Sequence, residues 1–229
     1  MISVVVPVYE EGESIVDWLR VLFEQHAVTQ CIVVDASEPR AYKANWARVR
    51  DVFPGAELSY VAARKKGRGA QMNQGAEACT GNILLFLHAD TYLPDGALAE
   101  IQDAIRREHH WGRFNVSFDN EGRPFATIAS MMNRRSRISG IATGDQAMFM
   151  TRAAFDLVNG FDEIPLMEDI AMSKKLNTIA PPACLESKVV TAARRWEQNG
   201  VWRTVALMWW LRLAYWLGIS PEKLARWYR

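Results

Sequence analysis

The feature that most constrains the fold is a regular alternation of short apolar runs with amphipathic segments in the first half of the chain. Residues 2–8 are largely apolar and β-branched, which is typical of a strand buried on both faces. Residues 15–23 then place apolar side chains at helical spacing, as expected for a helix with one buried face. The same pattern predicts further strands at 31–34, 58–62 and 83–87, and further helices near 42–52, 69–79 and 98–105.

This alternation predicts an α/β fold whose mostly parallel central sheet is covered by helices on both faces. The second half is less regular, with strands expected at 112–118 and 146–150 and helices at 126–137, 152–158 and around 172–179. A chain of 229 residues is long enough to bury one substantial core. We therefore expect one domain over residues 1–198, followed by a helical segment over 199–229 that is not an independent domain.

Composition excludes several classes of protein. The net charge of +1 provides no electrostatic footprint for nucleic acid. Cys31, Cys79 and Cys184 are too widely spaced to indicate a zinc site, and they are expected to be buried thiols in a reducing compartment. The first residues run directly into a strand without the pattern of a signal peptide, so we expect a cytoplasmic location.

Candidate chemistry lies directly after the predicted strands, because ligands of open parallel sheets bind beyond the carboxyl ends of the strands. Glu11 follows the first strand, Asp35 the second, and His88 and Asp90 the fourth. Any one of these acids could simply cap a helix. Several carboxylates gathered at one sheet edge are costly without a compensating cation, which favours a metal site.

Five motifs occur in order over roughly residues 2–180: VVVPVYEE, VVDAS, KKGRGAQMNQGAEACTGNILLFLHADT, GFDE and MEDIAMSKKL. In this order and spacing they resemble family 2 glycosyltransferases. The resemblance implies a Rossmann-like GT-A fold and the transfer of a sugar from a nucleotide-diphosphate sugar to a hydroxyl acceptor. UDP-sugars are the commonest donors in that family, so a UDP-sugar is the favoured donor here.

The resemblance also implies roles for the nucleotide-sugar site. Pro7, Tyr9 and Glu11 occupy positions that line the nucleotide base pocket. Asp35 matches an acid that holds the base or the ribose, and Arg68 matches a basic residue near the nucleotide. The alternative for Arg68 is a solvated cation on a glycine-rich turn.

Two further residues occupy the positions of the two acids of the family's metal-binding D-x-D motif. Asp90 matches its last acid, which implies that Asp90 ligates Mn²⁺ or Mg²⁺ bound to the diphosphate. His88 stands where the first acid is usual, and neutral imidazole suits softer metals than Mg²⁺. We therefore expect His88 to contact the ribose or to support the metal ligand.

The Glu168-Asp169 pair matches the E-D motif of the family, in which the aspartate removes the proton of the acceptor hydroxyl. This role implies attack from the face opposite the diphosphate, and so inversion at the anomeric carbon. The alternative is a pair of first-turn acids that stabilise a helix dipole. Glu168, Arg195 and Trp196 are expected on the acceptor side of the site. Arg195-Trp196 resembles the end of the Q-x-x-R-W motif of processive family members. Ala192 replaces the glutamine of that motif, so polymer synthesis is not predicted.

Tryptophan is concentrated at the C-terminal end. Residues 201–219 are rich in tryptophan and leucine, but arginines interrupt them and the charge-free stretches are too short to span a bilayer. Tryptophan and arginine suit the membrane interface, so this segment is interpreted as an interfacial helix that holds the enzyme beside a lipid-linked acceptor at the inner face of the plasma membrane. The alternative is a helix packed on the domain or in a homodimer.

Two other functions are weighed against glycosyl transfer. A sugar nucleotidyltransferase shares the nucleotide-binding design but carries a glycine-rich G-x-G-T-R loop after its first strand, where this chain has residues 7–10. The second alternative is a non-catalytic protein that binds a nucleotide sugar or a membrane. It is suggested by His88, which replaces the usual first acid of the D-x-D motif. The presence of both Asp90 and Asp169 argues against this second alternative.

Overall fold

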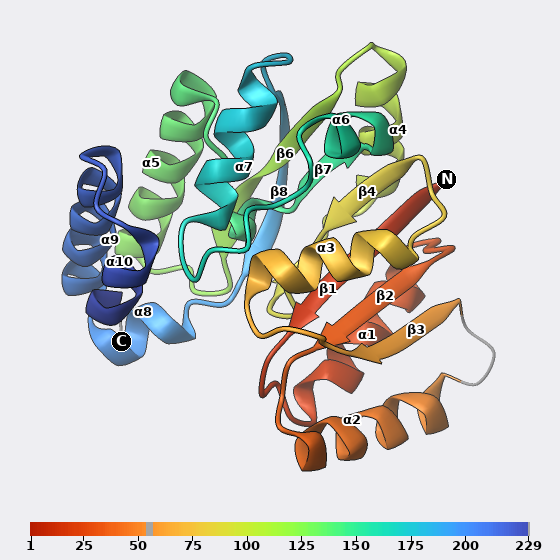
Figure 1. The fold of residues 1–229 in the computed structure, drawn as a ribbon. Helices are drawn as coiled ribbons and strands as arrows, with labels where there is room; N and C mark the ends of the chain where they lie inside the picture. Colours follow the sequence, from red (N-terminus) through yellow and green to blue (C-terminus); the bar gives the residue numbers. More distant parts are fainter. Residues whose placement is uncertain (54–56, 229) are drawn as a thin grey trace.

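The computed structural model describes residues 1–53 and 57–228, apart from the side chains of Arg195 and Asn199. Figure 1 shows a central sheet with helices on both of its faces. Among the described residues the sheet has eight strands in the order β3-β2-β1-β4-β7-β6-β8-β5. The predicted α/β class, with a central sheet covered by helices on both faces, is confirmed.

The first half of the chain forms the predicted strand and helix pairs. Its strands are β1 (Ile2–Val8), β2 (Cys31–Asp35), β3 (Leu58–Ala62) and β4 (Ile83–Phe86), and its helices are α1 (Ser14–Gln25), α2 (Pro39–Val52), α3 (Arg68–Ala78) and α4 (Ala97–Arg106). The strands β1 to β4 pair in parallel, so their carboxyl ends lie at one edge of the sheet.

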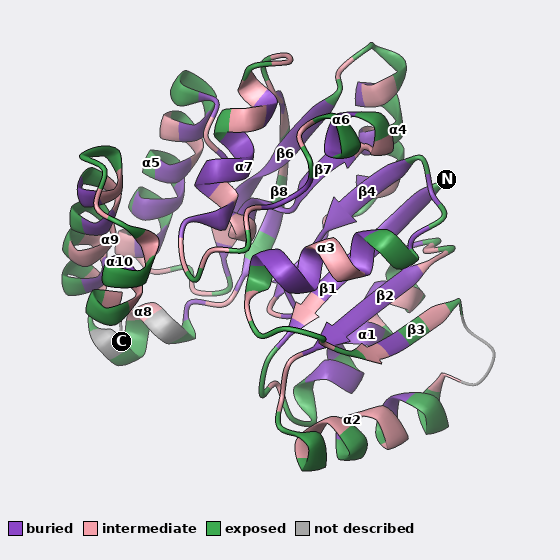
Figure 2. Cartoon of the chain, viewed as in Figure 1, coloured by how far each residue is buried: buried purple, intermediate pink, exposed green. Residues whose placement is uncertain are grey.

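The pleat of β1 separates two hydrophobic cores. Val4 and Val6 pack in the core that contains residues of α1, α2 and α4, whereas Val5 packs in the core beneath α3. All three valines are fully buried, as expected for the central strand of a sheet covered on both faces. Figure 2 shows the resulting distribution, with a buried sheet and exposed outer helix faces.

The second half adds antiparallel strands to this sheet. Its elements are β5 (Thr91–Tyr92), β6 (Trp111–Phe118), α5 (Arg123–Ser139), a short 3-10 helix (Gly144–Gln146), β7 (Met148–Thr151), α6 (Arg152–Leu157), α7 (Glu168–Asn177) and β8 (Ala183–Thr191). The strand expected to begin at residue 146 begins instead at Met148, because residues 144–146 form the 3-10 turn.

Two strands were not predicted from the sequence. The strand β8 alternates irregularly between buried and exposed side chains, so it lacks the period-2 pattern that identifies a half-buried strand. It pairs in parallel with β6 and antiparallel with β5, which has only two residues. Both strands depend on pairing between distant segments rather than on local sequence.

The C-terminal segment contains α8 (Arg194–Asn199), α9 (Val201–Trp216) and α10 (Pro221–Tyr228). The chain turns after α9 at Gly218, which has a φ of 85°. Leu211 of α9 and Leu224 of α10 are buried against Ile170 of α7, so one face of the segment packs on the domain. The opposite face is exposed, and no helix within the described ranges is both long and apolar enough to cross a bilayer.

Candidate active site

Two adjoining cavities lie at the carboxyl ends of β1 and β4. The β1 cavity, of about 300 Å³, is lined among others by Pro7, Tyr9, Glu11, Lys66, Arg68, His88, Asp90 and Glu168. The α7 cavity, of about 150 Å³, is lined among others by Gly144, Asp145, Asp169, Thr191, Trp196 and Arg212. The two cavities share Arg68, His88, Asp90, Leu166, Glu168 and Tyr228.

The loop after β1 forms one wall of the β1 cavity. The backbone N–H of Glu10 donates to Ser37 Oγ at 2.8 Å, which joins this loop to the loop after β2. The Tyr9 ring lies 3.8 Å from Lys66 Nζ, a cation–π contact that places both side chains at the cavity. Burial raises the pKa of Glu11, and the negative charge of Asp90 raises it further. The carboxylates of Glu11 and Asp90 therefore share one electrostatic environment.

Asp35 lies at the end of β2 and is 1% exposed. Its carboxylate accepts hydrogen bonds from Ser37 N at 2.7 Å, Tyr60 Oη at 2.5 Å and Asn45 Nδ2 at 3.5 Å. Asp35 does not line the β1 cavity or the α7 cavity. Its carboxylate instead holds the loop after β2 against β3 and α2, an arrangement that the sequence pattern did not indicate.

The start of α3 brings Arg68 to both cavities. Gln71 Nε2 donates to the carbonyl oxygens of Val8 and Val34, each at 2.8 Å, and so fixes the helix start to the ends of β1 and β2. A Cβ at Gly69 would lie 2.3 Å from the carbonyl oxygen of Asp162, so only glycine allows this close approach.

His88 follows β4 and packs against the turn before β7. A Cβ at Gly144 would lie 2.3 Å from His88 Cε1, so the ring packs directly on the Gly144 backbone. His88 Nδ1 lies 3.6 Å from Asp145 Oδ1. The imidazole therefore contacts the turn that also carries one wall of the α7 cavity.

Asp90 is positioned by the unpredicted pairing of β5 with β8. Its Oδ1 accepts a hydrogen bond from Thr91 Oγ1 at 3.2 Å, and its carbonyl oxygen accepts one from Ala192 N at 3.1 Å. Within the described ranges, no three His, Cys, Asp or Glu side chains form a ready metal cage. Mg²⁺ is commonly held by one or two carboxylates together with substrate phosphates, so Asp90 with Glu11 nearby fits such a metal.

Asp169 lies at the start of α7. Met167, the N-cap residue that precedes the helix, has a left-handed φ of 73°, an uncommon conformation for a residue other than glycine. Asp169 Oδ2 accepts a hydrogen bond from Gly144 N at 3.1 Å, and Oδ1 accepts one from Ile170 N at 2.7 Å. The carboxylate is thus fixed against the same turn that supports His88.

Burial raises the pKa of Asp169 from 3.8 to about 6, and repulsion by Glu168 acts in the same direction. The two backbone hydrogen bonds only partly oppose this effect. Reduced solvation lowers the pKa of Arg68, but the carboxylates of Glu168 and Asp145 outweigh this effect and raise it. An aspartate whose pKa lies near neutrality is suited to general base catalysis.

The structure therefore brings most of the predicted site residues to the two cavities. Trp196 lines the α7 cavity, with its ring edge-on to Phe118 at 5.7 Å, whereas the side chain of Arg195 lies outside the described residues. Sequence reasoning missed Asp145 and Tyr228. The Gly-Asp pair at 144–145 was available as a turn signal, but no local pattern marks a tyrosine at the far end of the chain as part of this site.

Comparison with known proteins places this geometry in a family. Residues 3–156 match the model of the family described as glycosyl transferase family 2. No curated relative matches the chain by sequence.

Solved structures that are similar in fold include those of two proteins. A mannosyltransferase from Pyrobaculum calidifontis, in complex with GDP-Man and Mn²⁺, has 19% identity and a TM-score of 0.65; the match covers 84% of this chain and 56% of that one. TarS 1-349 of S. aureus, in complex with UDP-GlcNAc, has 19% identity and a TM-score of 0.66 over 83% of this chain and 58% of that one. The chain thus spans a little over half the length of these proteins. Because the matched family model covers most of the chain and the fold agrees with it, the chain belongs to glycosyl transferase family 2.

Proposed function

We propose that this protein is an inverting, metal-assisted glycosyltransferase that moves a sugar from a nucleotide-diphosphate sugar to an acceptor hydroxyl. The observation that carries the proposal is the junction of the two cavities. Arg68, His88 and Asp90 line both, and Asp169 lies in only one of them. A donor in the β1 cavity would therefore present its reacting sugar to a carboxylate that is suited to removing a proton.

The nucleotide sugar is proposed to bind in the β1 cavity. Pro7, Tyr9 and Glu11 form the wall expected to hold the base, while Lys66 and Arg68 supply positive charge for the diphosphate. The similar structures were solved with GDP-Man or UDP-GlcNAc, which supports a nucleotide-sugar donor, with UDP-sugars favoured.

Asp35 is proposed to support this site from behind. Its carboxylate already accepts three hydrogen bonds, from Ser37, Asn45 and Tyr60. Direct contact with the ribose or the base therefore requires at least one of these donors to move. Through Ser37, whose hydroxyl accepts the N–H of Glu10, Asp35 orders the loop that lines the base pocket.

A divalent metal, Mn²⁺ or Mg²⁺, would be held by Asp90 with Glu11 nearby. When bound, the metal supplies positive charge that stabilises the departing diphosphate. His88 is proposed to orient the site by packing on Gly144 rather than to act as a hard oxygen ligand.

Asp169 is proposed as the catalytic base. It takes the proton of the acceptor hydroxyl while the acceptor oxygen forms a bond to the anomeric carbon. The bond between that carbon and the diphosphate oxygen breaks, and its electron pair leaves with the nucleoside diphosphate. Attack from the face opposite the leaving group inverts the anomeric centre. Burial is the main cause of the raised pKa of Asp169, and the neighbouring Glu168, which is 7% exposed, adds to it.

The donor and the base are tested by two measurements. A thermal-shift panel of UDP-, GDP-, CDP- and dTDP-sugars, each with and without Mn²⁺, should show one nucleotide class that raises the melting temperature more with the metal. Asp169→Asn should retain this shift but lose transfer to acceptor or to water. Turnover close to that of the unmodified protein would reject Asp169 as the base.

Turnover assays that follow the nucleotide sugar with and without metal separate the alternative functions. A sugar nucleotidyltransferase would form the nucleotide sugar from a nucleoside triphosphate and a sugar phosphate. A non-catalytic binding protein would show the thermal shift without metal-dependent loss of the donor. Either result would replace the proposed transferase function.

Peripheral association with the inner face of the plasma membrane is proposed from the exposed face of α9. Trp210 and Trp216 are exposed on this helix, which also carries the exposed Arg203, and tryptophan favours the headgroup region. Substituting both tryptophans with glutamine should reduce flotation with anionic liposomes. Leu157→Gln, at an exposed apolar residue of α6, is the control. Equal flotation of all three proteins would reject the membrane contact and favour the alternative, a homodimer through α9.

A further inference from the structure

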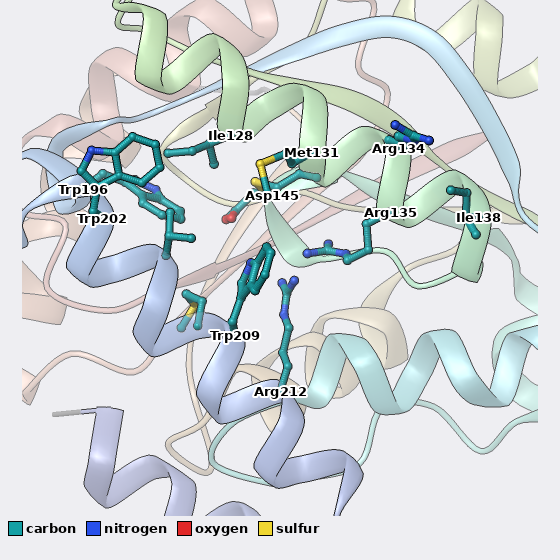
Figure 3. Close-up of a pocket in the computed structure, with 13 residues that line it drawn as sticks. Ile128, Met131, Arg134, Arg135, Ile138, Asp145, Trp196, Trp202, Trp209 and Arg212 are labelled. Carbon is teal, nitrogen blue, oxygen red and sulfur yellow. The ribbon is translucent and has the colours of Figure 1, made fainter.

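A third cavity, the α5–α9 groove, lies between α5 and the C-terminal helices (Figure 3). Its volume is about 490 Å³, within the range of pockets that hold small organic ligands. Apolar side chains from both helices form most of its wall, including Ile128, Met131, Ile138, Trp202, Val205 and Trp209.

The inner end of the groove reaches the proposed reaction site. Asp145, Trp196, Met208 and Arg212 line both the groove and the α7 cavity, in which Asp169 lies. A ligand in the groove could therefore place a hydroxyl near the base without crossing the β1 cavity. This position makes the groove an entry route for the acceptor.

The outer end of the groove is continuous with the exposed apolar face of α9. Trp209 is 61% exposed and Ile138 is 76% exposed, although both line the groove. A polar soluble acceptor would leave such a wall in contact with water, whereas an alkyl or isoprenoid chain would bury it.

The groove also carries buried positive charge. Nε and Nη2 of Arg135 are buried, and no hydrogen-bond partner for them exists among the described residues. Figure 3 shows that Arg135 and Arg212 both point into the groove. Burial lowers the pKa of Arg135, and the carboxylates of Asp169 and Asp145 only partly oppose this effect. A buried guanidinium with unpaired N–H groups is costly, and an anionic group with oxygen acceptors would satisfy it.

We propose that the α5–α9 groove binds the acceptor, and that the acceptor is a membrane lipid with an apolar chain and an anionic headgroup. The chain lies against the tryptophan and isoleucine wall, and Arg135 and Arg212 pair with the headgroup so that its hydroxyl faces Asp169. This assignment rests on the proposed transferase function and specifies the chemical class of its acceptor.

Binding of monomeric amphiphiles to the full chain tests the groove by isothermal titration calorimetry. The probes are decyl phosphate and octyl phosphate below their micelle concentrations, decyltrimethylammonium, and inorganic phosphate. Decyl phosphate should bind about tenfold more tightly than octyl phosphate, because each buried methylene contributes about three- to fourfold in affinity. Decyltrimethylammonium and inorganic phosphate should not bind detectably at the same concentrations.

Variants locate the binding site. Arg135→Met retains the bulk of the side chain but removes its charge, and should weaken decyl phosphate at least tenfold. Arg137→Met is the matched control, because Arg137 is on the same helix but pairs with Glu186 and does not line the groove. Ile138→Glu adds a negative charge at an exposed rim position, where folding should be unaffected, and should also weaken decyl phosphate. Melting temperatures establish that each variant is folded.

Several outcomes overturn the inference. Equal binding of decyl phosphate and inorganic phosphate would reduce the groove to an anion site. Unchanged affinity in both Arg135→Met and Ile138→Glu would place the amphiphile elsewhere. A homodimer that Ile138→Glu dissociates, with no amphiphile bound to the unmodified protein, would mean that a second copy of the chain covers the groove.

The thermal-shift panel with nucleotide sugars distinguishes the two levels of the proposal. An unmodified protein that binds a nucleotide sugar but no amphiphile rejects only the lipid acceptor. One that binds the amphiphile but no nucleotide sugar rejects the transferase function and, with it, the acceptor role of the groove.

Discussion

Replacing the proposed base should make the protein more stable at neutral pH. Burial, with a contribution from Glu168, raises the pKa of Asp169 from 3.8 to about 6. The fold therefore favours the protonated acid. This stabilisation is fully present below about pH 4, where the unfolded chain is also protonated, and is lost as the pH rises through about 6. Above that pH the buried carboxylate of Asp169 is ionised in the folded protein, which lowers the free energy of unfolding.

The magnitude follows from the size of the pKa change. A rise from 3.8 to about 6 corresponds to about 3 kcal/mol between the neutral and ionised forms. The hydrogen bonds from Gly144 and Ile170 already lower the pKa of Asp169, so this figure is net of their effect. Asparagine resembles the neutral acid in shape and charge. Asp169→Asn should therefore exceed the unmodified protein in stability by about 3 kcal/mol at pH 8, and by about half as much at pH 5.

Urea denaturation of both proteins at pH 5, 6, 7 and 8 measures this difference, since the unfolding free energy extrapolates linearly to water. Asp156→Asn is the control, because it makes the same substitution at an exposed acid of α6 that lines neither cavity. A constant difference between Asp169→Asn and the unmodified protein across this range would refute the reasoning.

Three other predictions test the site and its supports. The kcat for transfer should fall about tenfold per pH unit below pH 6, because Asp169 must be ionised to accept a proton; a pH-rate profile that is flat from pH 5 to 8 would contradict this role. Gly144→Ala should destabilise the protein by about 1–3 kcal/mol and lower kcat, since the new Cβ would lie 2.3 Å from His88 Cε1; unchanged melting and turnover would show that the ring moves freely. Tyr60→Phe should cost about 1–3 kcal/mol in urea denaturation, because it removes a hydrogen-bond donor from the buried carboxylate of Asp35; a loss of donor affinity without a loss of stability would instead indicate direct ligand contact.

Much of the fold could be predicted because its signals are local. The alternation of buried strands and amphipathic helices between Ile2 and Arg106 depends on side-chain periods of 2 and 3.6, which are visible in the sequence itself. Parallel strands then place Glu11, His88 and Asp90 at one sheet edge, and the two cavities include all three.

The remaining strands and part of the site could not be predicted in this way. The strand β8 has no regular alternation, and β5 has only two residues, so both exist through pairing with distant segments. The placement of Asp90 depends on them, through Thr91 and the backbone of Ala192.

The fold class, the family motifs and the order of the polar residues at the strand ends can be read from the amino-acid sequence, because each depends on neighbours along the chain. Which of these residues share a cavity follows from the three-dimensional packing. In the folded protein the carboxylate of Asp35 accepts a hydrogen bond from Tyr60, and Asp145 and Tyr228 line the site. Side chains of α9 and α5 together form a groove. These outcomes depend on packing between segments far apart in the chain, since the free energy of burial depends on which surfaces meet and not on sequence order.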